Sequence, residues 1–245
     1  PHITLLVTTL VSAAQTPSAL QRNSQTSGQY TTTYYDYDAL GRRIGKTSFT
    51  QTSAQAAATA KRSWYGWDGD RLVSTETHTP EGRERVCTVY EPQSFVPLLR
   101  FAWARHEEGK ANSEAPPDPQ LLYYHCNHLG TPEALIDRQG QLVWQAEFDP
   151  WGNLRSEFNP QQLDQPIRMQ GQQLDLESGL FYNRYRYYAP GMGRYVTQDP
   201  IGLRGGMNVF AYVGAMPTLL VDPVGLWASQ MGFYVHQQVG QYIFG

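Results

Sequence analysis

Short runs in which apolar and polar residues alternate dominate the chain, and many of them end in a tight turn. The segments YDYDALGRRI (35–44), YGWDGDRLV (65–73) and FDPWGNL (148–154) each combine an aromatic residue, an Asp, a Gly-containing turn and an apolar strand start. Alternation with a period of two predicts β-strands, and a turn between two such runs predicts a hairpin. The irregular repetition predicts an all-β fold of stacked β-hairpins.

The segment FYNRYRYY (181–188) alternates over its whole length. This pattern predicts one half-buried strand with Phe181, Tyr185 and Tyr187 on one face. Arg184 and Arg186 then fall on the other face, where we expect them to lie over neighbouring Tyr rings. The GMG that follows at 191–193 predicts a hairpin turn.

Other stretches break the strand pattern. The polar, Pro-rich segment 106–119 and the Ser/Thr/Gln/Ala tract 47–60 predict loops. The apolar opening has neither a basic region nor an initiating Met, which favours a buried strand or the start of a fragment over the apolar part of a signal peptide. Apolar residues after Leu226 recur at spacings of three and four, which predicts a short C-terminal helix that Gly232 and Gly240 weaken.

Composition excludes several classes of protein. The net charge is −3, only 17% of residues are charged and 13% are aromatic, which is unlike nucleic-acid-binding or disordered chains. No run approaches the ~18 apolar residues of a membrane span. Two cysteines, Cys87 and Cys126, are too few for a disulfide framework and are interpreted as ordinary thiols.

A search for catalytic or metal-binding motifs finds one candidate cluster, formed by His125, Cys126 and His128. Adjacent strand residues point to opposite faces, and no second Cys/His pair completes four ligands, so a strand and turn is the favoured interpretation. Cys126 has no evident base beside it, which argues against a nucleophile. The sequence implies no metal and no cofactor.

One phrase occurs twice, as QDPIGLR (198–204) and LLVDPVGLW (219–227). Asp-Pro-x-Gly is a turn sequence, because Pro fixes φ, Asp can bond its own backbone and Gly tolerates positive φ. Two turns are therefore the simpler interpretation. The alternative is that Asp199 and Asp222 are brought together for chemistry at the bond after Leu226.

Residues 170–226 closely resemble the C-terminal end of the Rhs (rearrangement hotspot), or YD-repeat, core. The phrases quoted above, with YEPQSFVPLLR (90–100) and the segment 125–153, resemble the same family in the same order. The resemblance runs from about Tyr30 to Leu226. It divides the chain into 1–29 outside the family, shell strands over 30–165, an autoproteolytic segment over 166–226, and the truncated start of a variable toxin region over 227–245.

The resemblance implies a hollow β-shell that encloses a C-terminal toxin, whose last segment is an intramolecular aspartyl protease. It maps the catalytic pair onto Asp199 and Asp222 and the cut onto the bond between Leu226 and Trp227. It also implies a bacterial protein, made in the cytoplasm and exported, whose partners are its own toxin segment, the rest of the shell, a secretion apparatus and an immunity protein. Neither a nucleic acid nor a membrane is expected as a partner.

The chemistry of two carboxyl groups suits that mapping. Two carboxylates in hydrogen-bonding distance cannot both ionise, so one keeps a proton while the other activates a water. Arg194 is a weaker candidate for orienting a carboxylate, with a surface ion pair as its alternative role, and residues 207–213 are expected to form a return strand between the aspartates. The other motif positions are interpreted as turn residues: Pro200, Gly202, Gly205, Gly206, Pro223 and Gly225. A non-catalytic YD-repeat module, in which the two Asp-Pro turns do not meet, remains the alternative function.

Overall fold

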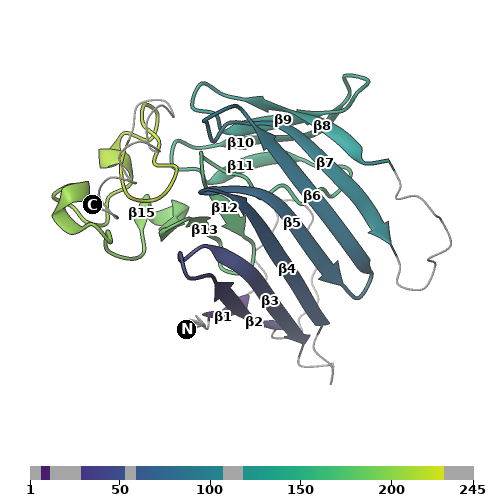
Figure 1. Cartoon of the computed structure of the whole chain (residues 1–245), viewed down its shortest axis with the longest axis horizontal. Coiled ribbons are helices and arrows are strands. Elements are labelled where there is room, and N and C mark those ends of the chain that lie inside the picture. Colours follow the sequence, from purple (N-terminus) through teal and green to yellow (C-terminus); the bar gives the residue numbers. More distant parts are fainter. Residues whose placement is uncertain (1–6, 12–28, 53–58, 107–117, 229–245) are drawn as a thin grey trace, which may run out of the picture.

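The chain forms two antiparallel sheets that are joined by an irregular segment (Figure 1). The computed structural model describes residues 7–11, 29–52, 59–106 and 118–228. The predicted all-β fold is confirmed. The loop expected at 106–119 falls mostly outside the described residues, and so does nearly all of the expected C-terminal helix.

The larger sheet holds eleven strands in the order of the sequence, so that each strand pairs with the next one along the chain. Figure 1 shows these strands as one broad, twisted wall. The first strand lies in the N-terminal segment that the family resemblance leaves out, and it pairs with the second. The strands are β1 Val7–Val11, β2 Gln29–Tyr37, β3 Arg43–Thr52, β4 Thr59–Asp68, β5 Arg71–Thr79, β6 Gly82–Tyr90, β7 Pro97–His106, β8 Gln120–Cys126, β9 Pro132–Ile136, β10 Leu142–Phe148 and β11 Leu154–Phe158.

The smaller sheet has four short strands, also in sequence order, and lies between β3 and the β10–β11 turn of the wall, which it contacts at Arg43 and Trp151. Three 3-10 turns accompany it, and the first lies between β14 and β15, where GMG predicts a hairpin turn. The elements are β12 Gln173–Asp175, β13 Leu180–Asn183, β14 Arg186–Ala189, η1 Pro190–Met192, β15 Arg194–Tyr195, η2 Gly202–Gly205 and η3 Val213–Ala215.

Four hairpin turns of the wall are built in the same way, with an Asp or Asn in the first position. In the turn after β2, Asp38 Oδ1 accepts hydrogen bonds from the backbone N–H groups of Leu40 (3.0 Å) and Arg42 (2.8 Å). Asn127, Asp137 and Asp149 bond the N–H groups two and four residues ahead in the same manner. In each of these turns the side-chain oxygen thus takes the place of a backbone carbonyl as the hydrogen-bond acceptor.

Two sequence-based predictions of local structure are wrong. The tract 47–60 was expected to form a loop, but 47–52 belong to β3 and 59–60 to β4, because Thr and Phe suit a pleated strand. The segment 181–188 was expected to form one strand, but it is a hairpin of β13 and β14 whose turn lies at Arg184 and Tyr185. Arg184 has φ of 51°, which reverses the chain without a glycine.

Buried charges fasten the smaller sheet to the wall. Arg43 of β3 and Asp175 of β12 form an ion pair of 2.6 Å with side chains 1% and 0% exposed. Lys46 contacts the same carboxylate at 3.3 Å and also Glu177 at 2.8 Å. The Arg43 guanidinium lies over the Tyr182 ring of β13, 4.3 Å from its centroid. An ion pair that is so little exposed to solvent stabilises the fold only while both charges are present, because a lone buried charge is strongly destabilising.

The hairpin β13–β14 therefore has two different faces. Tyr182 and Tyr187 are opposite each other in its register and face the Arg43 cluster of the wall. Asn183 and Arg186 form the next pair of the register and point to the other face. The hairpin thus separates the wall from the residues that Arg186 contacts on the opposite face.

Replacing Arg43 by Met should lower the free energy of unfolding by about 3 kcal/mol, because it leaves the buried Asp175 carboxylate without its shortest ion pair. The matched control is Lys61→Met, which removes a half-exposed ion pair of 3.4 Å with Asp164 and should change the free energy of unfolding by less than about 1 kcal/mol. Urea unfolding followed by Trp fluorescence measures both. Equal small effects would contradict a fastening role for Arg43.

Candidate functional site

Asp199 and Asp222, from the two Asp-Pro phrases, meet at one guanidinium nitrogen. Arg186 Nη2 lies 3.1 Å from Asp199 Oδ2 and 3.2 Å from Asp222 Oδ2. All three side chains are at most 3% exposed. The carboxylates are therefore bridged by a cation, which lowers the repulsion between them.

The Asp222 phrase wraps around its own carboxylate. Oδ1 accepts hydrogen bonds from three successive backbone N–H groups: Gly225 at 2.8 Å, Leu226 at 2.9 Å and Trp227 at 3.2 Å. Such a concave row of N–H groups is an anion-binding arrangement. Gly225 is required in it, because its φ is +80° and a Cβ would lie 2.6 Å from the Asn183 carbonyl oxygen. One carboxylate oxygen thus contacts both sides of the Leu226–Trp227 bond.

The segment that contains Asp199 forms a different turn, although it shares the Asp-Pro-x-Gly-Leu sequence with the Asp222 segment. Its Oδ1 accepts the N–H of Ile201 at 3.0 Å, and its carbonyl accepts that of Gly202 at 2.9 Å. The 3-10 turn η2 follows and brings Gly205 against the Asp199 carboxylate. A Cβ at Gly205 would overlap Asp199 Oδ2 and lie 3.1 Å from the Leu226 carbonyl oxygen. Gly205 therefore lies close to both the Asp199 carboxylate and the Leu226 carbonyl, and neither could keep its position if residue 205 had a side chain.

Arg186 is held in place from several sides. Its Nε donates to the Gly225 carbonyl and its Nη1 to the Val209 carbonyl (3.3 Å). Its guanidinium stacks on the Tyr195 ring, 3.6 Å from the centroid. The Tyr195 hydroxyl donates to Asp222 Oδ2 at 2.9 Å. This network removes the rotational freedom of the cation that joins the two carboxylates.

Burial raises the pKa of the Asp222 carboxyl group, and Arg186, Tyr195 and the backbone N–H groups of its turn oppose this rise only in part. Burial also raises the pKa of Tyr195 well above its ordinary value, with the negative charge of Asp222 as the next cause. Tyr195 therefore stays a protonated donor, whereas a proton on Asp222 is easier to form than on an exposed aspartate.

The remaining residues singled out in the sequence lie around this pair. Pro200, Gly202 and Gly206 belong to the turn after Asp199, and Pro223 to that after Asp222. Leu226 is 3% exposed and packs with Phe95 and Val224, while Trp227 is half-buried beside them.

Arg194 does not contact either carboxylate. It is exposed and lies over the Phe210 ring, 4.9 Å from the centroid, because the pleat of β15 turns it away from buried Tyr195. The return strand expected at 207–213 is also wrong. That segment is irregular and follows 194–199 through a single bridge, Arg194 with Ala211, and two backbone hydrogen bonds.

The sequence interpretation missed Arg186, Tyr195 and Asn183 as members of the site. It did place Arg186 over Tyr rings, as the structure has it. A stronger signal was available, because a charged residue between buried aromatics needs a counter-charge. The Asp-Pro phrases supply the two nearest downstream carboxylates in the sequence.

The His125–Cys126–His128 cluster forms a strand end and a turn. Cys126 donates to the Pro97 carbonyl at 3.6 Å, and His128 lies 3.1 Å from the Thr218 carbonyl. Within the described ranges no group of three or more His, Cys, Asp and Glu side chains could hold a metal ion. Across the same ranges no helix has the length and apolar character needed to cross a bilayer.

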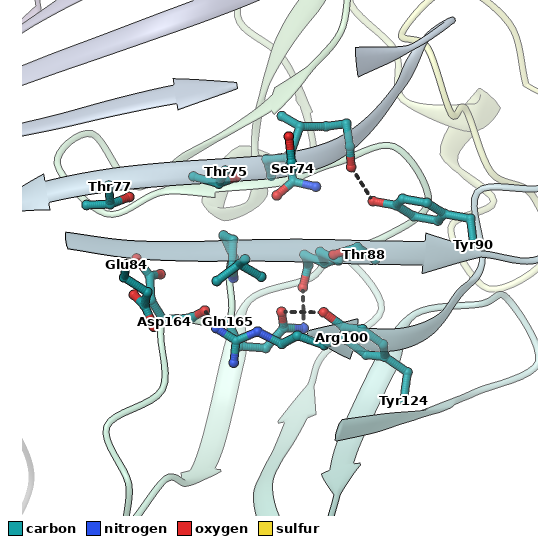
Figure 2. A pocket seen from close by; sticks show the side chains of 15 residues that line it. Ser74, Thr75, Thr77, Glu84, Thr88, Tyr90, Arg100, Tyr124, Asp164 and Gln165 are labelled. Carbon is teal, nitrogen blue, oxygen red and sulfur yellow. Dashed lines mark hydrogen bonds between the residues drawn. The ribbon is translucent and has the colours of Figure 1, made fainter. Parts of the chain in front are cut away.

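A separate hollow lies on the wall, between β5–β8 and residues 164–167 (Figure 2). Its polar groups hold that segment to the wall: Arg100 donates to the Asp164 carbonyl at 3.1 Å and Tyr124 to Gln165 at 3.4 Å. The Tyr90 hydroxyl donates to the Leu72 carbonyl at 2.9 Å. Its lining includes neither Asp199 nor Asp222. The hollow is therefore separate from the aspartate pair.

Comparison with known proteins identifies the family. The profile of the RHS protein family matches residues 122–157. Toxin protein Tse5 of Pseudomonas aeruginosa is 42% identical over 210 residues, which is 78% of this chain and 15% of that protein. Double-stranded DNA deaminase toxin A of Burkholderia cenocepacia is 35% identical over 207 residues, or 80% of this chain and 14% of the toxin.

A solved structure resembles the chain as well. The crystal structure of TcdB2-TccC3 without hypervariable C-terminal region matches with a TM-score of 0.65 and 27% identity, over 84% of this chain and 9% of that one. The chain belongs to the bacterial Rhs/YD-repeat family and corresponds to a shell region of its toxins. It spans only about 15% of the length of these two toxins.

The Cys126 thiol should react slowly with iodoacetamide, because burial raises its pKa to about 12 and keeps the thiolate scarce near neutral pH. In a Cys87→Ser chain at pH 8 we expect alkylation at least about 100-fold slower than that of a free cysteine peptide, with the rate rising toward pH 12. Mass spectrometry measures the rate. Alkylation as fast as that of the peptide would show an activated thiol instead.

Proposed function

We propose that this chain is the terminal part of an Rhs-type toxin shell and cuts its own backbone between Leu226 and Trp227. Asp199 and Asp222 act as the aspartyl pair, and the cut frees the C-terminal segment from the shell that encloses it. The cut is a single intramolecular turnover, so the chain is both enzyme and substrate.

One observation carries the proposal. The Asp222 carboxylate is joined through Arg186 to Asp199 and at the same time contacts the nitrogen of the Leu226–Trp227 bond at 3.2 Å. A turn needs only one aspartate, whereas hydrolysis of a peptide bond needs an acid and a base at the same bond. Because the bond is delivered by the chain itself, alignment alone can supply ~7 kcal/mol or more of the barrier.

The reaction is a hydrolysis in which the two aspartates have different roles. Asp199, whose carboxylate and the Leu226 carbonyl both lie close to Gly205, takes a proton from a water that adds to the carbonyl carbon. Asp222, whose pKa burial raises, gives a proton to the Trp227 nitrogen, and the C–N bond breaks. The products are a carboxyl group on Leu226 and an amine on Trp227.

The comparisons support the shell assignment in a specific way. The relatives carry unlike names, a toxin protein and a DNA deaminase toxin, yet share the part that this chain represents. A shared part is more readily explained by delivery than by the activity that differs between them. The name of the TcdB2-TccC3 structure places a hypervariable region at its C-terminal end.

The alternative is a structural module in which both turns only shape the backbone. The three N–H groups on Asp222 Oδ1 favour it, because a capping aspartate makes the same bonds. Capping gives no reason for Arg186 to hold a second buried carboxylate beside the same bond. The two functions are separated by testing for a cut.

Replacing either aspartate by asparagine should abolish the cut and leave the fold intact, because a carboxamide keeps the shape but cannot exchange the proton. We expect a purified wild-type fragment that ends at Leu226 and intact Asp199→Asn and Asp222→Asn chains. Intact mass spectrometry at neutral pH distinguishes this cut from acid cleavage after Asp in Asp-Pro. An intact wild-type chain, or a cut that persists in both variants, would contradict the proposal.

A methyl group at residue 205 should stop the cut without touching either aspartate. In Gly205→Ala the new Cβ overlaps Asp199 Oδ2 and crowds the Leu226 carbonyl, so one or both must move, and we expect at least about a 100-fold slower cut, as for misplaced catalytic groups. The control is Gly191→Ala in η1, where a Cβ meets open space. Equal cutting by both variants would show that this contact is not needed.

A further inference from the structure

Two side chains beyond the aspartate pair meet at Asp222. Tyr195 of β15 donates its hydroxyl hydrogen to Asp222 Oδ2 at 2.9 Å. Asn183 of β13 donates from Nδ2 to the Tyr195 hydroxyl oxygen at 2.8 Å and to the Asp222 carbonyl at 2.9 Å. Tyr195 and Asn183 are both 0% exposed. Three separate parts of the chain thus converge on one carboxyl group.

We infer that Tyr195 and Asn183 are positioning residues, which fix the direction in which the Asp222 carboxyl group faces Arg186 and the Leu226–Trp227 bond. The inference rests on the proposed self-cleavage and names two residues that act through Asp222. Neither contacts the bond that breaks.

The direction of each hydrogen bond follows from the donors available. Because Asn183 Nδ2 donates to the hydroxyl oxygen, the one hydroxyl hydrogen of Tyr195 is free to point at Asp222. A flipped Asn183 amide would set its carbonyl oxygen against the Asp222 carbonyl oxygen, which has no hydrogen to donate, so the Nδ2 group must face Asp222 and the neighbouring Tyr195 hydroxyl. Asn183 Oδ1 is buried and has no hydrogen-bond partner among the residues described, a cost that indicates the amide is present for its two donors.

Tyr195 also holds the Arg186 guanidinium in place, because the guanidinium carbon stacks 3.6 Å from the centroid of the Tyr195 ring. Asp222 Oδ1 is committed to the N–H groups of its own turn, so the orientation of Oδ2 toward Arg186 depends on the remaining contacts. Other charged or titratable groups surround Asp222. Arg186 and Tyr195 contact it directly, Asp199 lies on the other side of Arg186, and Tyr212 is close by.

Tyr195→Phe tests the inference because it removes the hydroxyl and keeps the ring that packs on Arg186 and Tyr212. Tyr188→Phe is the matched control, a buried tyrosine of the same cluster whose hydroxyl donates to the Trp151 carbonyl at 3.0 Å. At a pH where Asp222 is protonated in both chains, we expect Tyr195→Phe to cut up to about tenfold more slowly, the value of a hydrogen bond that orients a neutral carboxyl group. The control should cut at the wild-type rate.

The pH dependence separates positioning from a loss of packing. The Tyr195 hydroxyl lowers the pKa of Asp222, so its removal should move the Asp222-controlled limb of the pH–rate profile to higher pH. The ¹³C carboxyl resonance of Asp222, assigned by its absence in Asp222→Asn, should titrate at higher pH in Tyr195→Phe than in the wild type. Asn183→Ala, which leaves the hydroxyl without its donor, should shift the midpoint the same way by a smaller amount.

The outcomes distinguish this inference from the proposed function. A wild-type chain that cuts, with an unshifted limb and resonance in Tyr195→Phe, overturns the positioning roles and leaves self-cleavage standing. A wild-type chain that does not cut overturns self-cleavage. In that case an upward shift of the resonance in Tyr195→Phe, absent in Tyr188→Phe, still supports the hydrogen-bonded orientation, and no shift overturns it.

Discussion

The arrangement of the smaller sheet depends on the Arg186 guanidinium, which holds two buried carboxylates that would otherwise repel each other. Asp199 and Asp222 come from turns that share four letters but bond differently, one to the N–H of Ile201 and the other to three successive N–H groups. Without a cation between them, neither turn could bury its carboxylate so near the other. The stacking of Arg186 on the Tyr195 ring then holds in place the guanidinium that both carboxylates contact.

The hairpin β13–β14 carries that charge and also binds the wall. Its alternating faces divide the work: Tyr182 and Tyr187 face the Arg43 cluster, and Asn183 and Arg186 face the aspartates. The wall residues near Arg43 and the aspartates therefore contact opposite faces of the same hairpin. This coupling gives a physical reason why the site and the larger sheet belong to one folded unit.

Much of the fold could be predicted from the sequence, because period-two alternation and Asp/Gly turns are local signals. The same signals failed where local preference was indecisive. FYNRYRYY alternates like a single strand, yet Arg184 adopts φ of 51° and reverses the chain, so the hairpin is set by tertiary contacts. Arg186 and Tyr195 were interpreted as aromatic packing, because their partner Asp222 lies 36 and 27 residues away along the chain, outside any local pattern. Arg194 was named as a candidate for orienting a carboxylate, but the pleat of β15 turns it outward over the Phe210 ring.

The contacts around Trp227 have a consequence for what can follow the shell. Asp222 meets residues 225–227 through backbone N–H groups, which every residue except proline possesses. These three hydrogen bonds are made by the peptide backbone, whereas the Trp227 side chain packs separately, beside Phe95, Val224 and Leu226. Any residue other than proline at position 227 would keep the N–H bond to Asp222, so the backbone part of this turn does not depend on which side chain follows Leu226.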